Sequence, residues 1–138
     1  MSKTLHIDTD SDPGSWERAL RKPKQSERMI QRAIRQYLAK RGFISAHVPN
    51  GASLAGNAKR RAMQMNNLKG DGLVVGFPDL IVMGTDARVG FMEVKAEGGK
   101  QNDNQKAVQA WMERDGHKYA VVRSVDDAAE TLAEWGWS

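Results

Sequence analysis

Cysteine is absent from the 138 residues, so both a disulfide framework and a thiolate metal site are excluded. The three histidines, His6, His47 and His117, lack the spacing of a metal-binding motif. No run approaches the roughly 18 apolar residues of a membrane span, and the N-terminal residues lack the apolar core of a secretory signal. We therefore expect one cytoplasmic domain with no membrane partner.

Acidic residues are almost missing from residues 18–69, where Glu27 is the single acid among thirteen lysines and arginines. This segment carries a charge of +12, whereas residues 1–17 carry −3 and residues 70–138 carry −5. Such asymmetry is typical of a surface that binds a polyanion, because Lys and Arg gain from counterion release near phosphates. A well-solvated basic surface is the alternative. The charge pattern thus favours a nucleic-acid partner.

Apolar periodicity and turn residues predict the order of the structural elements. Residues 1–24 have no apolar periodicity, and we expect them to form a mobile arm in front of a domain over residues 25–138. Within that domain the patterns predict helices at residues 26–42, 57–68, 102–116 and 124–135, and strands at residues 43–48, 79–83, 89–97 and 118–123. Residues 84–88 have the composition of a hairpin turn. Alternating helices and strands of this kind predict an α/β fold.

The expected hairpin turn sets a register that can be written down in advance. If the turn centres on Asp86, the numbers of paired residues sum to 172, which places Asp79 opposite Glu93. Directly opposed side chains lie on one face of the sheet, with Cβ atoms about 4.5–5.5 Å apart. Lys95 shares this face with Glu93, since side chains alternate along a strand. The register therefore predicts two carboxylates and an ammonium group side by side.

Two carboxylates so close repel each other unless a cation lies between them. A site that consists of carboxylate oxygens, with few soft ligands, favours Mg²⁺ or Mn²⁺. Such an ion can polarise a phosphodiester and activate water, while Lys95 orients that water or offsets the charge of the transition state. The pattern predicts metal-assisted phosphodiester hydrolysis. The alternative is a structural salt-bridge network of Glu93 and Lys95 beside Asp79.

The motifs in this region resemble those of a known nuclease superfamily. Gly76-Phe77-Pro78-Asp79-Leu80 followed by Glu93-Val94-Lys95 matches the PD-(D/E)XK signature, and Gly99-Lys100 with Gln105 at a helix start resembles its VRR-NUC branch. The resemblance implies a restriction-endonuclease-like core with a mixed central sheet flanked by helices. It also implies a Mg²⁺- or Mn²⁺-dependent endodeoxyribonuclease that acts on branched or flapped DNA. For a small free-standing member, the resemblance further implies a homodimer that resolves four-way (Holliday) junctions.

The resemblance also assigns roles to single residues. It implies a metal site of Glu27, Asp79, Glu93 and the backbone carbonyl of Val94, and it implies catalytic roles for Asp79, Glu93, Lys95 and Gln105. Glu27 lies on the inward stripe of the first helix; the alternative is a first-turn Glu favoured by the helix dipole. Gln105 can contact a water or a phosphate near a helix N-terminus, and otherwise it is a surface residue.

Contacts to DNA are expected from the basic and glycine-rich segment that follows the first strand. The candidates are Asn50, Lys59, Arg60, Arg61, Lys69 and Lys100. A solvated helix face is the alternative for Lys59–Arg61. Three other functions remain open, namely a flap or single-cut nuclease, a restriction-like nuclease that reads base edges, and a catalytically silent DNA-binding protein. A dimer interface could involve Met63, Met65 or Leu68, or the Trp-rich C-terminal segment.

Overall fold

The computed structural model describes residues 25–49 and 56–137. The chain forms, in order, α2 (Glu27–Lys40), β1 (Ile44–His47), α3 (Ala58–Gly70), β2 (Leu80–Met83), β3 (Val89–Val94), α4 (Asp103–Arg114), β4 (Lys118–Val122) and α5 (Val125–Glu134). The order matches the prediction from sequence. The arm expected over residues 1–24 and the DNA-contact candidate Asn50 lie outside the described residues.

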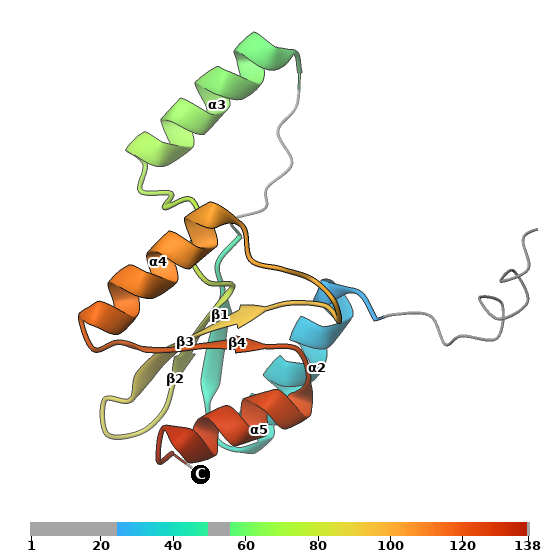
Figure 1. Ribbon diagram of the computed structural model, residues 1–138, viewed down its shortest axis with the longest axis vertical. Helices are drawn as coiled ribbons and strands as arrows, with labels where there is room; N and C mark the ends of the chain where they lie inside the picture. The colour runs from blue at the N-terminus through green and yellow to red at the C-terminus, as the bar shows by residue number, and fades with distance from the viewer. Residues whose placement is uncertain (1–24, 50–55, 138) are drawn as a thin grey trace, which may run out of the picture.

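The four strands form one mixed sheet in the order β1-β2-β3-β4. β1 pairs with β2 and β2 with β3 in antiparallel fashion, whereas β3 and β4 are parallel. Helices α2 and α5 cover one face, and α4 lies against the other (Figure 1). The predicted α/β fold with a mixed sheet flanked by helices is therefore confirmed. No helix in the described part of the chain is long and apolar enough to cross a membrane.

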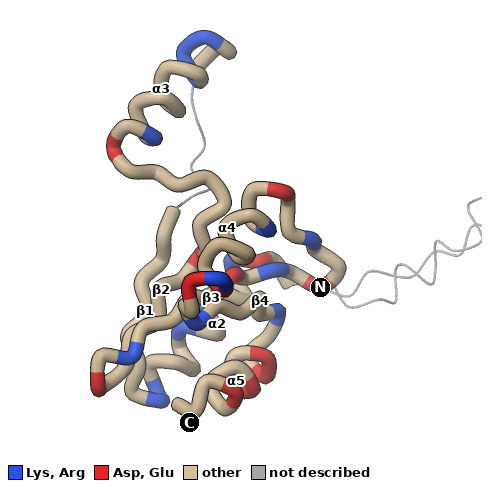
Figure 2. Tube along the Cα trace, turned by 60° about the vertical axis from the view of Figure 1, so that its left-hand side comes forward, with Lys and Arg blue, Asp and Glu red and all other residues tan. Residues whose placement is uncertain are grey.

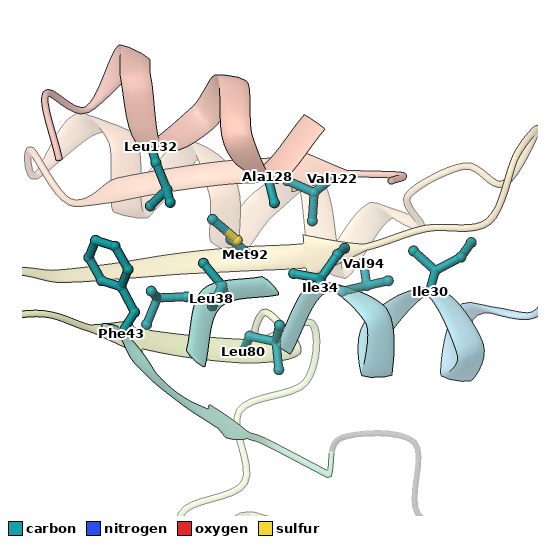
Figure 3. Packing of buried hydrophobic residues seen from close by; sticks show 11 residues of the cluster. Ile30, Ile34, Leu38, Phe43, Leu80, Met92, Val94, Val122, Ala128 and Leu132 are labelled. Atoms are coloured by element: carbon teal, nitrogen blue, oxygen red, sulfur yellow. The ribbon is translucent and has the colours of Figure 1, made fainter. Parts of the chain in front are cut away.

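Helix α2 packs through the apolar stripe that its sequence predicts. Ser26 caps its N-terminus by accepting a hydrogen bond from the backbone N–H of Met29. Ile30, Ile34 and Leu38 are buried. They pack with residues of the sheet, of α5 and of the segment before β1 (Figure 3): Phe43, Leu80, Met92, Val94, Val122, Ala128 and Leu132. This core fixes the position of α2 against the sheet.

The β2–β3 hairpin has the predicted register. Ile81 pairs with Phe91 and Met83 with Val89, so that the paired numbers sum to 172. Asp86 and Ala87 form the turn with positive φ angles of 57° and 59°. This turn geometry requires the left-handed region, which Asp tolerates better than most residues.

The strand expected over residues 89–97 is shorter than predicted, since it ends at Val94. Beyond Lys95 the chain turns, with Gly98 at a φ of 77° and the N–H of Gly99 bonded to the carbonyl of Ala96 at 2.9 Å. Arg123 holds this turn by donating from Nη1 to the carbonyls of Ala96 and Gly99. The alternation in the sequence therefore continues past the point where tertiary contacts end the strand.

Helix α3 differs from the other helices, because it packs against none of the other described helices or strands. Asn57 caps it, and none of its residues is buried. It projects away from the body of the domain (Figure 1). The basic helix predicted over residues 57–68 therefore exists, but as a free-standing element.

Candidate active site

Asp79 and Glu93 meet at one end of the sheet, directly beyond the β2–β3 ladder. Asp79 precedes β2, and its Oδ2 accepts a hydrogen bond of 2.8 Å from the backbone N–H of Val94. Glu93 is only 1% exposed. The hairpin register brings the two carboxyl groups together, as the sequence predicts.

The environment of Glu93 strongly favours its protonated form. Burial raises the pKa of Glu93 to about 9, and the neighbouring Asp79 carboxyl with its negative charge adds to the rise. Glu27 acts in the same direction, whereas the positive charge of Lys95 lowers this pKa. Among the described residues, Glu93 Oε2 has no hydrogen-bond partner although it is buried. A buried, unsatisfied carboxylate oxygen of this kind is suited to a cation.

Lys95 lies next to this pair and is only 9% exposed. Its backbone N–H donates to the carbonyl of Val122 in β4 at 3.0 Å, which fixes the chain direction just after β3. Its charge is close enough to Glu93 to lower the pKa of that carboxyl. A desolvated ammonium group beside two carboxyl groups is equipped to interact with a phosphate.

Gln105 connects the site to α4. Its side chain forms the capping box of this helix with Asn102, and its Oε1 accepts a 3.0 Å hydrogen bond from the Asn102 N–H. Its Nε2 also donates to Glu93 Oε1 at 3.4 Å. The sequence allowed two interpretations of Gln105, and this geometry fits a contact at the site better than a surface position.

Gly76 allows the Pro-Asp turn to approach α4. A Cβ atom at this position would lie 2.5 Å from the backbone carbonyl carbon of Asn104 and 2.8 Å from the backbone nitrogen of Gln105. The φ of Gly76 is also positive, at 88°. Only glycine fits both conditions without displacing the start of α4. Gly76 thereby positions Asp79 and Gln105 relative to each other.

Tyr119 is a residue of this region that the sequence prediction missed. It lies on β4 opposite Phe91 and is 8% exposed. Burial and the neighbouring charge of Glu93 raise the pKa of its phenol above the usual range. Its hydroxyl is hydrogen-bonded to Gln101 Nε2 at 3.0 Å. The alternation of side chains along β4 was visible in the sequence, but the proximity of Tyr119 to Glu93 depends on the parallel pairing of β3 and β4.

A cleft of about 640 Å³ opens between the N-terminal part of α2 and the same end of the sheet. Glu27, Asp79 and Val94 line it, which agrees with the predicted inward position of Glu27. The remaining lining residues, which were not predicted, are Arg28, Gln31, Arg32, Arg35 and His47. The spacing of the three arginines on one helix face was the signal that could have found them.

The donor atoms at this end of the sheet suit a hard cation. Among the described residues, no three Asp, Glu or His side chains gather closely enough to hold a metal ion by themselves. A site based on Asp79 and Glu93 would agree with Mg²⁺, which proteins commonly hold through one or two carboxylates and water. The ligand roles of Glu27 and of the Val94 carbonyl stay predictions.

The predicted DNA-contact residues lie in two other places. Lys59, Arg60 and Arg61 form the exposed first turn of α3, at its outer end (Figure 2). Lys69 lies in the last turn of that helix, and Lys100 is exposed in the loop before α4. The structure therefore does not bring the basic turn of α3 to the carboxyl groups. The arginines that share a cleft with Asp79 and Glu27 belong to α2.

Comparisons with known proteins agree with this arrangement. The model of the VRR-NUC domain family matches residues 25–126. A solved structure of a VRR_NUC domain is similar to this chain with a TM-score of 0.54 and 21% identity, covering 78% of this chain and 94% of that one. At this identity the likeness concerns the fold alone. A comparison with curated proteins finds no match. The family match over most of the chain shows that the protein belongs to the VRR-NUC family, a family of nucleases that act on DNA.

Proposed function

We propose that the protein is a Mg²⁺- or Mn²⁺-dependent endonuclease that cuts branched DNA. The observation that carries this proposal is the meeting of Asp79, the buried Glu93 and the buried Lys95 at one end of the sheet. A purely structural salt bridge between Glu93 and Lys95 would not explain the second carboxyl group, Asp79. It would also not explain why Glu93 Oε2 lacks a hydrogen-bond partner among the described residues.

The residues of the site have separate tasks in this proposal. Asp79 and Glu93 hold the cation, and the bound ion would polarise the phosphodiester and lower the pKa of a water molecule. Lys95 stabilises the negative charge that grows on the phosphate in the transition state. Gln105 keeps the Glu93 carboxyl in place by donating from Nε2 to Glu93 Oε1, and the Val94 N–H holds Asp79 by donating to its Oδ2. Glu27, at the cleft wall, is the proposed third carboxylate.

Two separate basic surfaces support a branched substrate. One is the cleft beside α2, and the other is the outer turn of α3, which is far from the sheet (Figure 2). A linear duplex in the cleft leaves α3 without a contact. A junction or flap has a second arm that can reach it. Phosphate contacts of this kind select DNA by shape, because they carry no direct information on sequence.

We also propose that the protein acts as a homodimer, since a four-way junction needs two symmetric cuts. The exposed apolar surface supports this. Met63 on α3 is 58% exposed and Trp111 on α4 is 49% exposed. Beside Trp111, an apolar hollow of about 370 Å³ is lined by Val74, Phe77, Ala107 and Val108. Surface of this kind often marks an interface.

The test offers labelled four-way junction, flap, splayed-arm and linear duplex substrates with Mg²⁺, with Mn²⁺ and without a divalent ion, while sedimentation measures the oligomeric state. We expect paired cuts in the junction by a dimer, only with the metal. Asp79→Asn should abolish cleavage. Asp86→Asn is the matched control, because Asp86 lies in the turn at the other end of the hairpin, where Asn also tolerates a positive φ.

The same experiment separates the alternatives. Cuts in flaps alone by a monomer would indicate a single-cut nuclease, and cuts that follow sequence in linear duplex would indicate a restriction-like enzyme. Binding without cleavage under every metal condition would indicate a silent DNA-binding protein. Equal cleavage by Asp79→Asn and the wild type would contradict the whole site assignment.

A further inference from the structure

One wall of the active-site cleft is a row of three arginines on α2. Arg28, Arg32 and Arg35 recur at spacings of four and three residues, which places them on one side of the helix. All three line the cleft that also contains Glu27 and Asp79. A cationic wall therefore continues from the carboxyl groups along the helix.

These arginines are available to an anion. Within residues 25–49 and 56–137, none of the three forms an ion pair with a carboxylate, unlike Arg114 with Asp115. The side chains of all three residues are exposed to solvent. Arginines that serve only to keep a surface soluble are scattered over it, whereas arginines that bind phosphate gather in a cleft.

The far end of the row is held in a defined geometry. Arg35 donates from Nε to Ser45 Oγ at 3.2 Å and from Nη2 to the Ser45 carbonyl at 3.1 Å. Its other N–H donors have no partner among the described residues. Nearby, the Gln31 amide nitrogen lies 3.1 Å from His47 Nδ1, and both side chains line the cleft. The hydrogen bonds between Arg35 and Ser45 of β1 hold this guanidinium in place and reduce the entropy lost when it binds a ligand.

We propose that Arg28, Arg32 and Arg35 bind consecutive phosphates of the DNA strand next to the phosphate that is cut. The proposal rests on the nuclease function proposed above for the site of Asp79, Glu93 and Lys95. A helix rises about 10.5 Å between Arg28 and Arg35, and one DNA strand carries a phosphate about every 3.4 Å along the duplex axis. The row therefore spans about three phosphates, with Arg28 nearest to the scissile one.

The first test measures the salt dependence of DNA binding by the full chain without divalent ions, using fluorescence anisotropy of a labelled junction. Each phosphate contact contributes about 0.9 to the slope of log K against log salt concentration. The double variant Arg28→Gln/Arg32→Gln should make this negative slope shallower by about 2 and weaken binding at least tenfold in about 0.1 M salt. Arg28→Lys/Arg32→Lys should restore most of the slope, because the charges are kept.

The matched control is Lys40→Gln/Arg88→Gln, which removes two positive charges away from the cleft, at the C-terminal end of α2 and in the hairpin turn. It should keep the wild-type slope. If the arginine variant has the same slope as this control, the proposal is wrong. If the arginine variant has a smaller salt dependence while the wild type cuts no DNA with Mg²⁺ or Mn²⁺, the phosphate contacts of the arginines stand, and the nuclease centre and their position beside a cut fail.

The second test locates the contacts on the DNA. Uncharged methylphosphonates replace single phosphates at each position around the cut. In the wild type, binding should weaken at about three neighbouring positions on one side of the cut. In Arg28→Gln/Arg32→Gln the same replacements should have little further effect, since a contact that is already lost cannot be lost twice. Additive losses at all of these positions would overturn the assignment.

Discussion

Helices α2 and α3 are both rich in Lys and Arg, yet they differ in what the rest of the chain does with them. α2 buries Ile30, Ile34 and Leu38 and is held against the sheet, so its arginines line a cleft with two carboxylates. α3 buries no residue and carries its basic turn at its outer end (Figure 2). A charged side chain acquires a defined function when packing fixes its helix next to a reactive group.

The two helices also show that net charge along the sequence does not reveal which basic side chains lie beside the carboxyl groups. Residues 18–69 carry +12 in total, and the most compact basic run within them, Lys59–Arg61, lies on the free helix. The arginines of α2 are interleaved with apolar residues and attract less notice. Packing, and not local charge density, distinguishes the two helices. The predictions below compare the packed end of the sheet with α3.

The largest effect is expected at Lys95. Lys95→Gln should reduce the cleavage rate with saturating DNA by at least about 100-fold, because the variant loses a preorganised positive charge at the scissile phosphate. DNA affinity should change little. Single-turnover kinetics measures the rate. Lys118→Gln, an exposed residue at the other end of the adjacent strand, is the control and should behave as the wild type. A proportional loss of affinity and no loss of rate would instead make Lys95 a simple binding residue.

The glycines that flank the segment between α3 and the site form the next comparison. Gly72 and Gly76 both have positive φ, at 111° and 88°. A Cβ at Gly72 meets nothing within 4 Å, whereas at Gly76 it collides with the start of α4. Gly72→Ala should destabilise the fold by about 1 kcal/mol through its φ alone, and Gly76→Ala by about 3 kcal/mol. Urea unfolding measures both. Equal losses of unfolding free energy in the two variants would show that the start of α4 moves easily to make room for a side chain at position 76.

Glu93 makes the stability of the metal-free protein depend on pH. The pKa of Glu93 rises from 4.5 to about 9 on folding, so the folded state binds the proton more tightly. The favourable contribution is complete below about pH 4.5 and is lost as the pH rises towards 9. Glu93→Gln keeps the uncharged form, and we expect its stability relative to the wild type to increase steadily from pH 5 to pH 8.

Thermal unfolding between pH 5 and pH 9, in the presence of a chelator, checks this difference. Addition of Mg²⁺ or Mn²⁺ should narrow it, because the cation stabilises the wild-type carboxylate and not the amide. A constant difference across this pH range would show that the carboxyl does not titrate as described.

The smallest effect is expected on α3. Lys59→Gln/Arg60→Gln/Arg61→Gln should leave binding to linear duplex unchanged and weaken junction binding by only a few-fold, because these exposed residues contact at most a second DNA arm. Anisotropy with junction and linear duplex measures the ratio. A loss as large as that of Arg28→Gln/Arg32→Gln on linear duplex would reverse the roles that we assign to the two helices.

The parts of the site that could be predicted from the sequence depend on local rules. A turn centred on Asp86 determines the pairing of its flanking strands, and this pairing is the observed one. Alternation along residues 92–94 then separates Met92 and Val94, which are in the core, from Glu93. Helical spacing placed Glu27 on the side of α2 that faces the sheet. No long-range contact was needed for these steps.

The parts that could not be predicted depend on contacts between distant segments. The end of β3 at Val94 depends on Arg123, and the need for glycine at position 76 depends on α4. Gly90 is a similar case, because a Cβ there would lie 2.5 Å from the Trp135 ring. The arginine wall exists only because α2 packs beside Asp79 and β1. Spacing along one helix cannot reveal which element it faces.

The most direct test of the central claim uses the absence of cysteine, because a single introduced thiol is then unique. Arg32→Cys and Arg60→Cys proteins are mixed with junction DNA that carries a thiol-reactive tether on a phosphate about two nucleotides from the cut. The account predicts rapid cross-linking to Cys at position 32 and little at position 60. Equal or faster cross-linking at position 60 would contradict the claim that α2, and not α3, holds the strand that is cut.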